Sequence, residues 1–88
     1  MISSEDKIKL TEIAKRYKVS KIYLFGSNLD SFRDANDIDL AVEGLEGSLF
    51  FKFYGELILS LSKPVDVIDL NKKSLFCDIV RTEGILLV

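Results

Sequence analysis

The chain has 88 residues, 48% of them hydrophobic and 30% charged, a balance typical of one compact domain over residues 1–88 and not of a disordered chain. Its formal net charge of −2 leaves no excess of cations to hold a phosphate backbone, so we expect no nucleic-acid polymer as a partner. No apolar run is long enough to span a membrane, the start does not resemble a signal peptide, and the single cysteine fits reducing conditions, so we expect a cytoplasmic protein without a membrane partner.

The first half of the chain predicts one helix and two strands. Apolar side chains at helical spacing follow an acid-rich first turn and indicate a helix over residues 4–18. A short β-type run predicts a strand over 21–25 that stops at Gly26, and alternating polar and apolar residues predict a second strand over 37–42. The polar segment between them, 28–36, has room for a single helical turn.

The second half predicts two further helices, each followed by a strand. The clearest helix covers residues 48–62 and ends before Pro64, and a strand over 64–70 follows it. A short helix over 74–82 leads to a final strand over 85–88. The order indicates an α+β fold, a small mixed sheet of about four strands with helices packed mainly on one face. The short link between the first two strands permits an antiparallel pair, whereas the later helical crossovers suit parallel neighbours.

The helix predicted over 48–62 carries more apolar surface than a core contact needs. At about 100° per residue, its apolar side chains cover an arc of roughly 200°, about twice the width of an ordinary core-facing stripe. The arc consists of Leu49, Phe50, Phe51, Phe53, Tyr54, Leu57, Ile58 and Leu61. Phe51 and Ile58 lie at the far edge of this arc and indicate a protein interface. Burial of the helix on two sides, or homodimer packing, explains the arc equally well.

Three features carry groups suited to phosphate chemistry. Gly26-Ser27, directly after the first strand, is either a plain turn or a bare backbone with a hydroxyl that holds a phosphate. Asp37 and Asp39 project from one face of a strand, either as solvent-facing acids or as hard oxygen ligands for Mg²⁺. Asp66 lies inside an apolar strand, where a carboxylate requires exposure, a lysine partner or a place in a site.

In combination these features are far more specific than any one of them. The ordered pattern resembles the minimal nucleotidyltransferases of the DNA polymerase β superfamily over nearly the whole chain. The resemblance implies the polymerase β-like nucleotidyltransferase fold, with Gly26 and Ser27 binding a nucleoside triphosphate. It also implies that Asp37 and Asp39 bind two Mg²⁺ ions, for which Mn²⁺ can substitute. Asp66 is then the third metal ligand and helps to orient the attacking hydroxyl.

One position departs from the family's pattern. Many relatives carry a basic residue directly after Gly-Ser, where this chain has Asn28. Arg33 is the nearest candidate to bind the phosphates, and Lys21, Lys72 or Lys73 could also reach them. The alternative is that Arg33, Lys72 and Lys73 are solvated surface charges. The departure weakens the expectation of nucleotide affinity and leaves that of the metal site unchanged.

The resemblance implies an enzyme that moves a nucleoside monophosphate, AMP from ATP, to an acceptor hydroxyl. Minimal members of the family are commonly encoded beside a helical HEPN-domain protein, and some are antitoxins that adenylylate a tyrosine of that toxin. We therefore expect a protein adenylyltransferase with a HEPN-domain partner. The main alternative is a non-catalytic antitoxin that neutralises its partner by contact. Transfer to an aminoglycoside is a weaker hypothesis, since those enzymes usually carry an extra domain for the drug.

Overall fold

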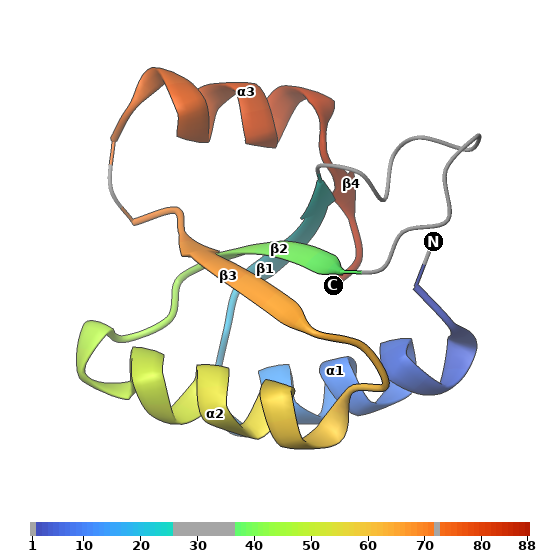
Figure 1. The fold of residues 1–88 in the computed structure, drawn as a ribbon. Coiled ribbons are helices and arrows are strands. Elements are labelled where there is room, and N and C mark those ends of the chain that lie inside the picture. Colours follow the sequence, from blue (N-terminus) through green and yellow to red (C-terminus); the bar gives the residue numbers. More distant parts are fainter. Residues whose placement is uncertain (1, 26–36, 72) are drawn as a thin grey trace.

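The computed structural model describes residues 2–25, 37–71 and 73–88, which form helices and strands (Figure 1). The elements are α1 (Ser4–Arg16), β1 (Lys21–Phe25), β2 (Ile38–Glu43), a short 3₁₀ helix (Gly47–Leu49), α2 (Phe50–Ser60), β3 (Val65–Asp69), α3 (Leu75–Glu83) and β4 (Ile85–Leu86). The α+β prediction is confirmed, and the predicted elements are present with ends that differ by a few residues. The turn expected within 28–36 lies outside the described residues.

The four described strands form one mixed sheet in the order β3-β2-β1-β4. β1 and β2 are antiparallel and β2 and β3 are parallel, as the short link and the first helical crossover predicted. The second crossover does not give a parallel neighbour, because β4 pairs antiparallel with β1 at the far edge. The physical reason is that α3 packs across the sheet over β1 and carries the chain to that open edge. β3 therefore remains an edge strand.

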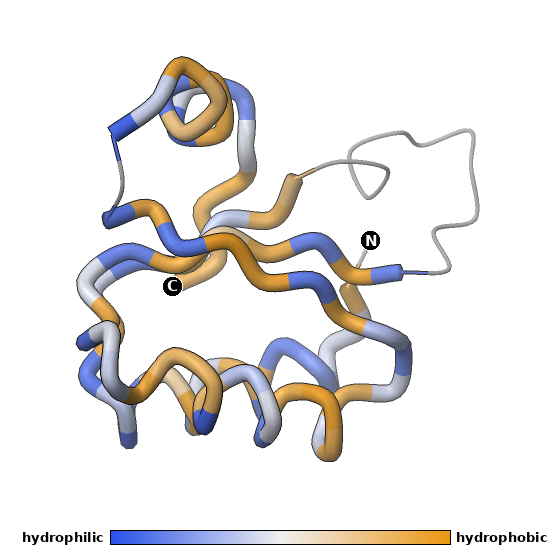
Figure 2. The backbone as a smooth tube through the Cα atoms, turned by 60° about the vertical axis from the view of Figure 1, so that its left-hand side comes forward, coloured by the Kyte–Doolittle hydropathy of each residue, from blue (hydrophilic) through white to orange (hydrophobic). Residues whose placement is uncertain are grey.

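Helices cover both faces of the sheet, with α1 and α2 on one side and α3 on the other (Figure 1). Two of the three described helices thus share one face, which is the mainly one-sided packing that the pattern predicted. Hydrophobic residues dominate the strands, with short hydrophilic interruptions (Figure 2). The larger core fills the space between the sheet and the first two helices, with Leu10, Ile13, Ile22, Leu24, Ile38, Leu40, Val42, Phe53 and Leu57 at its centre.

The start of α1 is fixed by two hydrogen-bonding side chains. Ser3 caps the helix, since its hydroxyl oxygen accepts the Asp6 N–H at 3.1 Å. The Asp6 carboxylate is itself buried, and it accepts the N–H of Ser62 at 3.1 Å and the Ser62 hydroxyl at 2.5 Å. Because Ser62 lies two residues after the end of α2, these bonds join α1 to the end of α2. In the described part of the chain no helix is long and apolar enough to cross a membrane.

α2 exposes part of its apolar arc. Phe53 and Leu57 are fully buried, whereas Phe51 is 84% exposed and Ile58 is 58% exposed. Burial of this helix on two sides by the described part of the chain is therefore wrong. Leu59, which the predicted arc did not include, is 88% exposed beside them. An uncovered apolar strip on α2 is consistent with a protein interface or with homodimer packing.

Candidate active site

β2 and β3 bring Asp39 and Asp66 side by side. The two residues are direct partners in the parallel register, and neighbouring strands lie about 4.8 Å apart. The residues on either side of each aspartate are buried in the larger core, so both carboxylates project to the opposite face of the sheet, the face that α3 partly covers. Asp39 is half-buried and Asp66 is exposed. The structure therefore joins two of the three predicted acids at one level of one face.

Asp37 lies in the bend directly before β2, two residues from Asp39, and is exposed. Among the residues that the structure describes, no three acidic, cysteine or histidine side chains gather into a cluster able to hold a metal ion. The paired carboxylates of Asp39 and Asp66 still fit Mg²⁺. That ion is commonly bound by one or two protein carboxylates, with water and substrate phosphates completing its octahedron. The donor set thus suits a cation that is shared with a phosphate substrate.

α2 supplies a hydroxyl to this pair. Tyr54 Oη lies 3.3 Å from Asp66 Oδ1 and 3.1 Å from the carbonyl oxygen of Val65. Burial raises the pKa of the Tyr54 hydroxyl, a backbone hydrogen bond from Val67 opposes that rise, and the nearby Asp66 carboxylate adds to it. The hydroxyl therefore stays protonated at neutral pH and can donate to either acceptor. From the sequence, Tyr54 was predicted only as part of the apolar arc. Spacing along the chain does not show which side chain reaches around the edge of a sheet.

The residues predicted to bind the triphosphate, Gly26, Ser27 and Arg33, lie outside the described residues, so their roles stay predictions. The described chain ends before this segment at Phe25 and resumes at Asp37. Phe25 is the register partner of Asp39 in the antiparallel β1–β2 pair. Phe25 and Asp37, the described residues that flank this segment, therefore lie beside the carboxylate pair.

Two of the lysines considered as phosphate ligands, Lys21 and Lys73, are described, and neither lies near that pair. Lys21 pairs with Glu43 at the other end of the β1–β2 ladder, four residues from Phe25, which is about 13 Å at the rise of a strand. Lys73 follows the carboxyl end of β3, whereas Asp66 lies near its amino end. Lys72 lies outside the described residues. Neither described lysine therefore lies where it could serve in place of the basic residue that many relatives carry at the position of Asn28.

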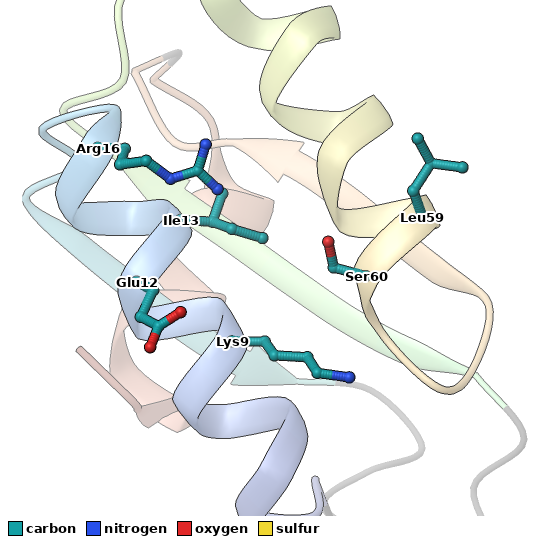
Figure 3. Close-up of a pocket in the computed structure, with 6 residues that line it drawn as sticks. All are labelled: Lys9, Glu12, Ile13, Arg16, Leu59 and Ser60. Atoms are coloured by element: carbon teal, nitrogen blue, oxygen red, sulfur yellow. The ribbon is translucent and has the colours of Figure 1, made fainter.

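Two surface pockets lie away from the carboxylate pair. One lies between α1 and α2 (Figure 3). It is lined by Lys9, Glu12, Ile13, Arg16, Leu59 and Ser60. The other lies at the carboxyl end of β3 and is lined by Gly47, Phe50, Phe51, Ile68 and Asp69. At the first pocket Arg16 donates to Glu56 at 2.8 Å, and hydrogen bonds from Tyr17 and then from Arg16 lower the pKa of that carboxyl. Neither pocket includes Asp39 or Asp66.

Several solved structures of toxin–antitoxin complexes contain a chain that is similar to this one. A chain of a toxin–antitoxin complex with AMP-PNP is 31% identical with a TM-score of 0.74, and the match covers 98% of this chain and 73% of that one. A chain of an MntA–HepT toxin–antitoxin complex is 27% identical with a TM-score of 0.72, covering 98% and 72%. A chain of the complex between the tri-AMPylated Shewanella oneidensis HEPN toxin and the MNT antitoxin is 29% identical with a TM-score of 0.71, covering 94% and 69%.

Comparison with protein families identifies the family of the chain. No curated protein matches the chain. The sequence model of the polymerase β nucleotidyltransferase family matches residues 8–88. This match includes both strands of the carboxylate pair and the segment between β1 and β2, so the predicted resemblance is confirmed. The chain belongs to the polymerase β nucleotidyltransferase family.

Proposed function

We propose that residues 1–88 form one nucleotidyltransferase domain that moves AMP from ATP to a tyrosine hydroxyl of a HEPN-domain partner and thereby acts as a cytoplasmic antitoxin. The observation that carries the proposal is the register pairing of Asp39 with Asp66 beside the ends of the Gly-Ser segment. Family membership supports nucleotidyl transfer. A similar chain in a complex with AMP-PNP supports an adenine nucleotide, and another in a complex with a tri-AMPylated HEPN toxin supports the acceptor.

In this proposal the chain's own residues bind and orient the reactants. Asp39 and Asp66 would hold Mg²⁺ or Mn²⁺, and Asp37 would be the further ligand. A bound cation would lower the pKa of the attacking hydroxyl and neutralise charge on the leaving pyrophosphate. Ser27 and the backbone at Gly26 donate hydrogen bonds to the triphosphate. The acceptor oxygen bonds to the α-phosphorus, the α–β anhydride bond breaks, and the hydroxyl proton passes to solvent.

The second candidate function is neutralisation of the partner by contact alone. It is favoured by the exposed apolar strip of Phe51, Ile58 and Leu59 on α2, and by Asn28 at the position where many relatives carry a basic residue. An interface of this kind needs no phosphate ligands. The two functions differ in one measurable respect, which is whether AMP becomes covalently attached to the partner.

Label transfer separates the two candidates. The protein is incubated with the product of the neighbouring gene, MnCl₂ and ATP labelled either at the α- or at the γ-phosphate. We expect label from the α-position alone on the partner, together with release of pyrophosphate, and loss of transfer in Asp39→Asn and in Asp66→Asn. Asp69→Asn is the matched control, because it removes the same charge from the same strand. Neutralisation of the partner without any label would overturn the proposal in favour of the binding module.

A further inference from the structure

The carboxylate of Asp66 lies where a helix on the opposite face of the sheet can reach it. Asp66 projects from the face that α3 partly covers, whereas α2 packs against the other face. If β3 lay in the interior of the sheet, the strands on its two sides would separate Asp66 from a helix on the other face. β3 is an edge strand, and α2 runs along it (Figure 1). A long side chain on α2 can therefore pass around the edge of the sheet.

Tyr54 is that side chain. Its hydroxyl oxygen lies 3.3 Å from Asp66 Oδ1 and 3.1 Å from the carbonyl oxygen of Val65. A phenol has one proton, so the two acceptors share it. The contact engages Oδ1 of Asp66, which leaves Oδ2 as the oxygen for another ligand.

The ring that carries this hydroxyl is held by its neighbours. Phe50 meets Tyr54 edge to face, with ring centroids 5.9 Å apart at an interplanar angle of 83°. Phe50 meets Phe51 in the same way, at 5.6 Å and 86°. Such pairs add specific orientation to apolar packing. The hydroxyl is therefore fixed relative to β3 by a row of rings on α2.

We infer that Tyr54 is a positioning residue for the cation site, holding the carboxylate of Asp66 at the level of Asp39 so that the two acids bind a divalent cation together. This inference rests on the proposed function, because it requires that the pair binds a cation. Partners in the outer shell of a metal site fix the orientation of its ligands, and their loss commonly weakens metal affinity by about 10- to 100-fold. At 3.3 Å, and with its proton shared, the Tyr54 contact belongs at the lower end of that range.

The competing explanation is that Tyr54 only supports the sheet edge, by donating to the outward-facing carbonyl of Val65. That role predicts a loss of thermal stability when the hydroxyl is removed, and no specific change in cation affinity. The inference predicts a change in cation affinity that depends on Asp66. Metal binding measured without nucleotide therefore distinguishes the two roles.

The test is Tyr54→Phe, which removes the hydroxyl and keeps the ring between Phe50 and β3. Binding of Mn²⁺ is titrated by electron paramagnetic resonance at a temperature where circular dichroism shows the variant to be folded. We expect an apparent Kd about 10-fold above that of the unmodified protein. In label transfer, the Mn²⁺ concentration for half-maximal rate should rise by the same factor, while the rate at saturating Mn²⁺ stays close to that of the unmodified protein.

Tyr17→Phe is the matched control. It too loses a hydroxyl that interacts with a carboxylate, that of Glu56, and its ring packs edge to face on Phe53 at 5.4 Å. Its Mn²⁺ affinity should be unchanged. In the Asp66→Asn background, Tyr54→Phe should cause no further loss.

The outcomes separate this inference from the proposed function. Equal Mn²⁺ affinity in Tyr54→Phe and Tyr17→Phe, with a loss in Asp39→Asn and Asp66→Asn, overturns the positioning role alone. Failure of the unmodified protein to bind Mn²⁺, both alone and with ATP, overturns both proposals. If Tyr54→Phe is too unstable to titrate, Tyr54→Met supplies an apolar side chain without a hydrogen-bond donor, and unchanged affinity in that variant also overturns the inference.

Discussion

Cation-dependent stability is the most direct test of the paired carboxylates. Asp39 and Asp66 face each other across adjacent strands about 4.8 Å apart, so both are in place only in the folded chain. A cation that bridges them binds the native state and not the unfolded one, and therefore raises the free energy of unfolding. Replacing either acid with asparagine keeps the size of the side chain and removes one charged ligand. We expect each replacement to abolish most of the stabilisation.

The size of the effect follows from mass action. For a site with a Kd of about 1 mM, a free Mn²⁺ concentration of about 10 mM adds about 1.4 kcal/mol to the free energy of unfolding. In a domain of 60–100 residues, about 1 kcal/mol shifts the melting temperature by roughly 4–8 °C. The unmodified protein should therefore melt about 6–11 °C higher with Mn²⁺ than without it. Asp39→Asn and Asp66→Asn should each shift by less than about 3 °C on the same scale.

Thermal melts followed by circular dichroism measure this shift directly. Each variant is compared with its own metal-free sample, so any effect of the substitution on the metal-free fold cancels. Asp69→Asn keeps an acceptor for the Asn71 N–H, which Asp69 Oδ1 accepts at 2.9 Å, and should retain the full shift. The reasoning is refuted if both pair variants keep the shift of the unmodified protein. It is equally refuted if the unmodified protein shows no shift with Mn²⁺, either alone or with ATP.

Three further predictions concern the turn after α3, the Gly-Ser segment and the exposed strip. A Cβ at Gly84 would lie 2.5 Å from a backbone carbonyl oxygen of α3, so Gly84→Ala should lower the free energy of unfolding, measured in urea, by about 1–3 kcal/mol. A Cβ at Gly55 meets open space, so Gly55→Ala should not destabilise the protein. Ser27→Ala should weaken binding of ATP with Mg²⁺ by about 1.5–3 kcal/mol in calorimetry, and equal affinity would reduce Ser27 to a turn residue. Phe51→Asp combined with Ile58→Lys should leave the melting temperature within a few degrees and abolish binding of the partner protein. Unfolding of that double variant would instead place both side chains in the core.

The sequence by itself determined which faces of the strands are buried. Along a strand, alternate residues point to opposite sides, so the sequence placed Asp39 and Asp66 on the face opposite to their apolar neighbours, which the structure shows to be in the core. In the same way, helical periodicity predicted that Phe51 and Ile58 lie outside the core stripe of α2. Helix and strand positions also followed from periodicity, with ends that differ by a few residues.

The tertiary structure alone decided which residues of different strands and helices lie next to each other. Register is a relation between two strands, so the pairing of Asp39 with Asp66, and the distance of Lys21 from Phe25, could not follow from either strand separately. The antiparallel place of β4 depends on where α3 packs across the sheet. Tyr54 reaches Asp66 only because β3 is an edge strand with α2 alongside it. Each of these contacts joins elements whose separation along the chain carries no information about their distance in space, and packing of the sheet and helices sets that distance.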